Sequence, residues 1–182
     1  MHAILGTSES CVATHASDLA VALVALDASI RLQGARGSRL VKLEDFYLLP
    51  GQTPDKENQL QPGEIIAEIA VPMLPLARKS TYVKVRDRAS YEFALTSAAV
   101  GLELDSGTIR DARVAVGGVG TKPWNLPEVR QVLIGKQLTE KVFRSAASLA
   151  VEGARPLSDN GFKIHLLQLT IIRALMNLGG LA

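Results

Sequence analysis

The order of the elements along the chain predicts an α+β fold, in which an antiparallel sheet carries helices on one face. Strand-like segments come first and end with two long apolar runs, at residues 93–104 and 109–116, whereas helix-like segments follow from residue 126 onward. Strands and helices that are segregated in this way pack as helices against an antiparallel sheet. The chain has 182 residues, 47% of them apolar, which is enough for a core in one domain or two small ones.

The first part of the chain is expected to contain one helix and a few strands. Ser17 and Asp18 stand where a helix start needs side-chain acceptors, and the run that follows them is apolar on every side. This pattern predicts a buried helix. The predicted elements are, in order, a helix at 18–27, strands at 29–33 and 39–43, a surface loop at 45–63 and a mostly buried strand at 65–71.

Paired prolines mark the best candidate for a domain boundary. Pro72 and Pro75 stiffen the connection after the strand at 65–71, because proline interrupts both strand ladders and helices. We therefore divide the chain into residues 1–76 and residues 77–182. The second part is predicted to contain a half-exposed strand at 81–86, the two apolar strands named above, and helices at 126–134, 139–154 and 162–178.

Composition argues against several classes of partner. The formal net charge is only +2, from 20 Lys and Arg against 18 Asp and Glu, so no charge excess points to nucleic acid or to anionic lipid. The longest apolar run, at 19–26, is too short to cross a membrane, and the N-terminus does not resemble a signal peptide. The expected location is the cytoplasm, or the periplasm if a partner subunit carries an export signal. Cys11 is the only cysteine, which excludes an intrachain disulfide and an iron–sulfur cluster held by this chain alone.

Residue spacing alone reveals no catalytic set. Cys11 and His15 are four residues apart, but a metal site needs further ligands, so a buried thiol is favoured and no metal site is predicted. The glycine-rich stretch at 117–120 lacks the following helix of a dinucleotide fingerprint and is expected to form a bulge or a tight turn. Ser17 and Asp18 are explained by helix capping, and Lys84 by a solvated position on a strand.

Several motifs, however, resemble those of a known family, the FAD-binding subunits of molybdenum hydroxylases of the xanthine dehydrogenase and carbon monoxide dehydrogenase type. The likeness extends over nearly the whole chain and includes features of the bacterial aldehyde or xanthine dehydrogenase branch. The motifs that carry it are Cys11–Leu23, Asp45–Gly51, Gly63–Ile66, Tyr82–Ala94 and Asn160–Ile164. On this resemblance, residues 1–76 are the C-terminal part of an FAD-binding domain, and residues 77–182 are a carbon monoxide dehydrogenase flavoprotein C-terminal domain.

The resemblance implies a cofactor, its contacts and its partners. Ser17 and Asp18 would contact the ribityl and phosphate region of FAD, Ile65 and Ile66 would border the isoalloxazine, and Lys84 would reach a ring oxygen. The partners would be a molybdopterin-binding large subunit and a 2Fe-2S small subunit, with an aldehyde or a heterocycle such as xanthine as substrate of the complex.

The glycine-rich loops that hold the pyrophosphate in this family are not found in the sequence, so the chain is expected to be a fragment. Flavin binding by the fragment itself is therefore expected to be weak or absent. The alternative is a structural or assembly remnant without flavin. Because an all-apolar helix and an open strand edge need cover, the chain is expected either to self-associate through its N-terminal part or to have that part less ordered than residues 77–182.

Overall fold

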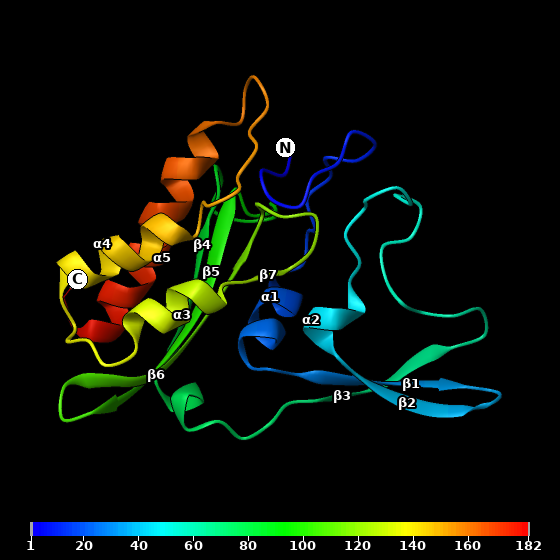
Figure 1. Cartoon of the computed structure of the whole chain (residues 1–182), viewed down its shortest axis with the longest axis horizontal. Helices are drawn as coiled ribbons and strands as arrows, with labels where there is room; N and C mark the ends of the chain where they lie inside the picture. The colour runs from blue at the N-terminus through cyan, green and yellow to red at the C-terminus, as the bar shows by residue number, and fades with distance from the viewer. Residues whose placement is uncertain (1, 182) are drawn as a thin grey trace.

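The computed structural model describes residues 2–181 and contains two antiparallel sheets with helices packed against them (Figure 1). The smaller sheet has the order β2-β1-β3, and its strands are β1 (Ser29–Gly34), β2 (Gly37–Lys42) and β3 (Ile65–Ala70). The larger sheet has the order β4-β5-β6-β7, and its strands are β4 (Ser80–Val85), β5 (Thr96–Asp105), β6 (Thr108–Gly117) and β7 (Trp124–Asn125). The helices are α1 (Asp18–Ala25), α2 (Leu43–Phe46), the 3-10 helix η1 (Pro75–Arg78), α3 (Pro127–Leu133), α4 (Glu140–Leu149) and α5 (Phe162–Gly179). The predicted α+β class is confirmed. The outer ends of the two predicted domains, residues 1 and 182, lie outside the described residues.

The larger sheet is covered on both faces, because its central strands are apolar on both sides. Val100 and Val114 belong to the main core, which the predicted helices α3, α4 and α5 complete on one face. Ala99 and Ala115 point to the opposite face and pack with Val21 of α1. Alternate residues of a strand lie on opposite faces, so near-continuous burial along β5 requires cover on both. The helix α1, predicted as part of the first domain, supplies the second cover.

The N-terminal segment also packs into the core of the larger sheet. Ile4 and Leu5 are buried in the same cluster as Phe143 of α4 and Leu167 of α5. The Ile4 amide donates to the Val119 carbonyl at 2.7 Å, so the backbone is held as well. The division near residue 76 stays a prediction, and the packing across it is extensive.

The strand predicted at 65–71 is present as β3, but the prediction that it is mostly buried was wrong. Along β3, Ile65 is 64% exposed, Ile66 49% and Ile69 47%. Among the described residues, β3 is an edge strand that pairs only with β1, and α1 covers the inner residues of β1, Ile30 and Leu32, instead. The mostly apolar sequence of β3 therefore indicated a strand but not its cover.

Two smaller differences concern helices, and a third concerns a strand. The helix predicted as buried at 18–27 leaves Leu19 66% exposed, because α1 rests on the sheet by one side only. The helix predicted at 139–154 ends at Leu149, and the chain then turns through Gly153 at a φ of +74°. Phe93, predicted to begin a strand, precedes β5 and is 64% exposed. Within residues 2–181, no helix has both the length and the hydropathy needed to cross a membrane.

Candidate functional site

The start of α1 is fixed by its own side chains. Ser17 has an extended backbone, and its Oγ accepts a hydrogen bond from the Ala20 amide at 3.2 Å, which confirms the predicted N-cap. Asp18 occupies the first turn, where a carboxylate is stabilised by the exposed amide groups of the helix. The cap therefore holds the Asp18 side chain at the mouth of the helix.

The Asp18 carboxylate joins α1 to the edge strand β4. The Lys84 ammonium donates to Asp18 Oδ2 at 2.7 Å, and the Tyr82 hydroxyl donates to Asp18 Oδ1 at 2.8 Å. Ser97 Oγ on β5 lies 2.9 Å from the same tyrosine oxygen. Burial raises the pKa of the Tyr82 phenol, so Tyr82 is a hydrogen-bond donor at neutral pH. We call these four residues the Asp18 cluster.

The structure thus brings together three of the five predicted site residues, Ser17, Asp18 and Lys84. Tyr82 and Ser97 were missed as members of the cluster. Tyr82 carried a signal, because it stands two residues before Lys84 on one strand, and such residues share a face. Ser97 carried none, since only the pairing of Lys84 with Ser97 across β4 and β5 places it there.

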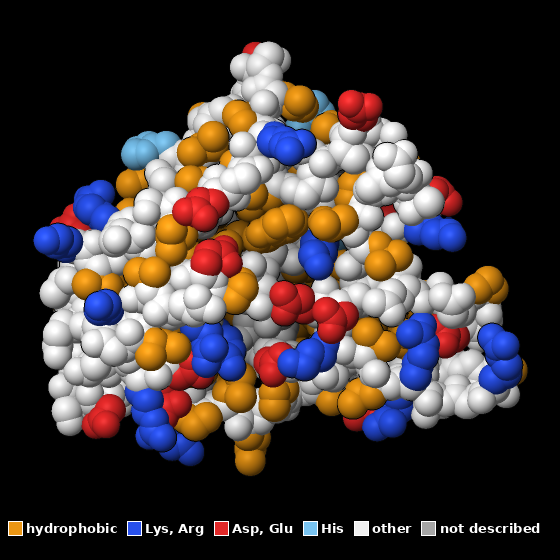
Figure 2. All heavy atoms as spheres, viewed as in Figure 1, with side chains coloured by type: hydrophobic (Ala, Val, Ile, Leu, Met, Phe, Trp, Pro, Cys, Tyr) orange, Lys and Arg blue, Asp and Glu red, His pale blue; other side chains and the backbone are white. Residues whose placement is uncertain are grey.

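Two clefts adjoin the start of α1. The larger has a volume of about 280 Å³ and opens between the N-terminal segment and the loop after α2, which lie close together in Figure 1. Cys11, Thr14, His15 and Ser17 line it from one side, and loop residues up to position 57 from the other. The smaller cleft has a volume of only about 10 Å³ and is lined by residues 14–18, Phe93, Ser97 and the turn at 117–118. In Figure 2, hydrophobic side chains gather in the hollowed middle of the face turned to the viewer.

His15 is the least satisfied polar side chain of the larger cleft. Its ring packs edge-on against Tyr47 with a centroid distance of 4.6 Å, and its buried Nδ1 has no hydrogen-bond partner among residues 2–181. Burial lowers the pKa of His15, which favours the neutral imidazole. Across the described part of the chain, no three His, Cys, Asp or Glu side chains converge as metal ligands would.

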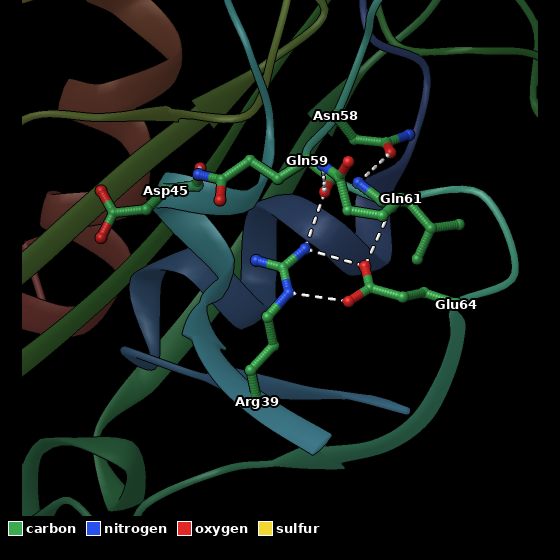
Figure 3. Close-up of polar contacts among 7 residues, drawn as sticks. Arg39, Asp45, Asn58, Gln59, Gln61 and Glu64 are labelled. Carbon is green, nitrogen blue, oxygen red and sulfur yellow. Dashed lines mark hydrogen bonds and ion pairs between the residues drawn. The ribbon is translucent and has the colours of Figure 1, made fainter. Parts of the chain in front are cut away.

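The far wall of the larger cleft belongs to a loop, residues 47–64, that is anchored at its end by Arg39 (Figure 3). The Arg39 guanidinium donates to Glu64 Oε1 at 2.9 Å and to Oε2 at 2.8 Å, and also to the Gln59 carbonyl at 2.7 Å. These bonds, with one from the Gln61 amide, hold the pKa of the Glu64 carboxyl at about 2. The sequence predicted the loop but gave no signal for this anchor.

Ile65 and Ile66, the two other predicted site residues, are not part of the Asp18 cluster. They begin β3 in the smaller sheet, opposite Gln33 and Leu32 of β1. Both side chains are largely exposed, which leaves them free to contact another group.

The predicted tight turn at 117–120 is present and forms a close contact with α1. Gly118 has a φ of +72°, and the Ala94 and Leu95 carbonyls occupy the space that a Cβ would need. A Cβ on Gly117 would lie 2.6 Å from Val21 Cγ2 and 2.8 Å from Ser97 Oγ. The glycines therefore allow β6 to approach α1 and Ser97 at the floor of the smaller cleft.

Fold and site together define a class, that of an α+β domain in which a capped helix start meets a strand lysine and adjoins two clefts. Residues 81–178 match the family model described as CO dehydrogenase flavoprotein C-terminal domain. Residues 9–74 match the model described as FAD binding domain in molybdopterin dehydrogenase. The chain belongs to this flavoprotein family.

Individual relatives agree with this assignment. The chain is 42% identical over 177 residues to the aldehyde oxidoreductase FAD-binding subunit PaoB of Escherichia coli, covering 96% of this chain and 52% of the relative. It is 39% identical over 145 residues to the glyceraldehyde dehydrogenase medium chain of Sulfolobus acidocaldarius, covering 80% and 49%. The chain thus spans about half the length of the curated relatives it matches.

Solved structures support the fold. The Cu,Mo-CO dehydrogenase structure matches with a TM-score of 0.79 and 24% identity, over 91% of this chain and 57% of that chain. Quinoline 2-oxidoreductase from Pseudomonas putida 86 matches with a TM-score of 0.77 and 23% identity, over 98% and 58%. At these identities the likeness establishes the arrangement of sheets and helices.

Proposed function

We propose that this chain is part of the FAD-binding electron-transfer subunit of a molybdopterin, iron–sulfur and FAD hydroxylase that oxidises an aldehyde or a heterocycle such as xanthine. The observation that carries the proposal is the Asp18 cluster, in which a capped helix start and a strand lysine meet beside two clefts. The relatives support it, since one is named an aldehyde oxidoreductase FAD-binding subunit.

In this proposal the cluster binds the cofactor and tunes it. Ser17 and Asp18 contact the ribityl and phosphate region, and the Lys84 ammonium reaches a ring oxygen. Bound FAD would supply the redox chemistry, accepting electrons that come from iron–sulfur clusters of a partner. The 2.7 Å pair with Asp18 keeps the Lys84 ammonium at the cluster and limits its range of positions. A cation held there favours negative charge on a reduced ring.

Ile65 and Ile66 are proposed to border the isoalloxazine. Their exposed side chains offer an apolar surface, which suits a flat aromatic group that would otherwise face water. Since they lie on the smaller sheet, the cofactor would have to extend from the Asp18 cluster toward β3.

A molybdopterin-binding large subunit and a 2Fe-2S small subunit are the proposed partners, located in the cytoplasm, or in the periplasm if exported together. The support is that relatives are named as subunits or medium chains of larger enzymes. When the chain is purified with such partners, we expect flavin absorbance bands. A correctly assembled complex that shows the iron–sulfur absorbance but lacks the flavin bands would contradict the proposal and favour a purely structural role.

The residues present fit part of the cofactor. The larger cleft, at about 280 Å³, is just below the roughly 300–1,000 Å³ of ligand pockets, so it can enclose only a portion of a dinucleotide. We therefore expect the 182-residue chain alone to bind FAD weakly or not at all. Flavin fluorescence quenching measures this, and a dissociation constant below about 1 µM, or roughly 8 kcal/mol, would mean that this half is sufficient.

A further inference from the structure

The first turn of α5 contains a buried cation whose neighbours are carbonyl groups. Lys163 is 0% exposed, and its ammonium donates to the His2 carbonyl at 3.1 Å and to the Gly118 carbonyl at 2.6 Å. No carboxylate pairs with it among the described residues. Burial lowers the pKa of Lys163, which reflects the cost of keeping a charge in this place.

Asn160, one turn earlier, binds the same segment of chain. Its Nδ2 donates to the His2 and Ala3 carbonyls, at 3.2 Å each, and its Oδ1 accepts from the Leu157 amide at 2.6 Å. The asparagine and the lysine therefore clasp the N-terminal segment against the start of α5. In Figure 1 the N-terminal segment and the loop before α5 lie at the same end of the molecule.

The clasp reaches the candidate site through the glycine turn. The Lys163 ammonium fixes the Gly118 carbonyl, and Gly117 packs directly against Ser97 and Val21. Ser97 in turn contacts Tyr82, which donates to Asp18. A continuous series of close contacts thus leads from the buried ammonium to the carboxylate of the Asp18 cluster.

The N-terminal segment provides a second connection. Clasped at residues 2 and 3, it pairs with the next part of the chain, because the Ala3 amide donates to the Val12 carbonyl at 2.8 Å. The His15 amide donates to the Gly120 carbonyl at 3.0 Å. Residues 11–17 line the larger cleft, so their position depends on both bonds.

A role in stability alone would not select a lysine for this position. A buried charge costs free energy that an apolar side chain of similar length avoids, and replacement of buried ionic groups by apolar ones is often neutral or stabilising. What the ammonium provides, and methionine cannot, is simultaneous donation to two carbonyl groups on separate segments.

We propose that Lys163 and Asn160 are positioning residues of the candidate site, which hold the Gly117–Gly118 turn and the N-terminal segment so that both clefts and the Asp18 cluster keep their shape. The inference rests on the proposed function in one respect only, namely the identity of the ligand that the clefts bind. Its test concerns the shape of the protein and requires no flavin, so the two can fail separately.

The test is hydrogen exchange of the 182-residue chain, resolved by residue, for the wild type and Lys163→Met. Loss of a charged donor should raise the exchange of the Ala3, Ile4 and His15 amides by roughly tenfold or more. The amides between β1 and β2 should exchange at the wild-type rate. The denaturant midpoint of unfolding should also be unchanged. Lys141→Met replaces an exposed lysine of α4 and is the matched control, expected to change none of these.

Two results would overturn the proposal. One is a folded Lys163→Met protein with unchanged exchange at the three amides, and the other is an equal rise throughout the chain, which indicates a general structural role. If Lys163→Met does not fold, Asn160→Ala removes the donors to His2 and Ala3 together with the acceptor of the Leu157 amide. The amide exchange rates of the N-terminal segment should then rise more than those of the rest of the chain. An equal rise everywhere would count against the proposal.

Discussion

Both sheets contain a strand rich in apolar residues, β3 in the smaller and β5 in the larger, but these two strands lie in opposite environments. β5 and β6 are buried for most of their length between α1 on one face and α3, α4 and α5 on the other. β2 and β3 are mainly exposed, and the buried core of the smaller sheet lies where β1 meets α1 and α2. The difference teaches that apolar content places a residue in a strand, whereas the number of layers around the strand decides what that residue contributes to stability.

The largest expected effect follows from truncating the core of the larger sheet. Phe143 is fully buried, so Phe143→Ala should lower the free energy of unfolding by about 3–5 kcal/mol. Ile66→Ala on the exposed β3 should change it by no more than about 0.5 kcal/mol. Urea denaturation measures both. Similar losses for the two variants would mean that the smaller sheet is covered in solution.

A second expectation concerns protection and association. The amides of β1 and β3 should exchange at least tenfold faster than those of β5 and β6, a difference of roughly 1.4 kcal/mol or more. If the open edge of β3 also causes self-association, light scattering should detect it, and Ile69→Lys should suppress it. Leu169→Lys, at an exposed position of α5, is the control. A strictly monomeric chain with equal protection in both sheets would contradict this comparison.

The ion pair between α1 and β4 should contribute less to the free energy of unfolding than the buried core does. Lys84→Met removes the partly exposed pair with Asp18, so the expected loss of stability is below about 1 kcal/mol. In a flavin-loaded subunit the same change should lower the reduction potential, because a cation near the ring is lost while the side-chain stem is kept. An unchanged potential with an unchanged flavin spectrum would return Lys84 to the role of a surface lysine.

The smallest expected effect is the pH dependence of the loop anchor. The pKa of Glu64 is about 2 in the folded protein, against an ordinary 4.5, so the stability it contributes is complete above about pH 4.5 and is lost as the pH falls toward 2. The fluorescence of Trp124, the only tryptophan, should report release of the loop, since Gly6 lies against both Trp124 and Leu49. Glu64→Gln should remove this pH response, whereas Glu152→Gln should retain it. If the Trp124 fluorescence of both variants responded equally to pH, Arg39 would be excluded as the anchor of the loop.

The sequence predicted local features that depend on neighbouring residues. The cap at Ser17, the strand containing Lys84 and the glycine turn at 117–120 all occur as expected, because each is fixed by a few consecutive residues. It could not predict the exposure of Ile65 and Ile66, since their apolar character suits a buried strand and an open edge equally well.

By itself, then, the sequence determined the α+β class, the order of elements and, through its motifs, the family. Tertiary structure alone decided that Asp18 meets Lys84, which is 66 positions away in the chain, and that Lys163 binds the His2 carbonyl, 161 positions away. It also placed α1 on the second face of the larger sheet. Periodicity and capping are local interactions, whereas these contacts depend on how the sheets pack, and that packing is set by the whole chain at once.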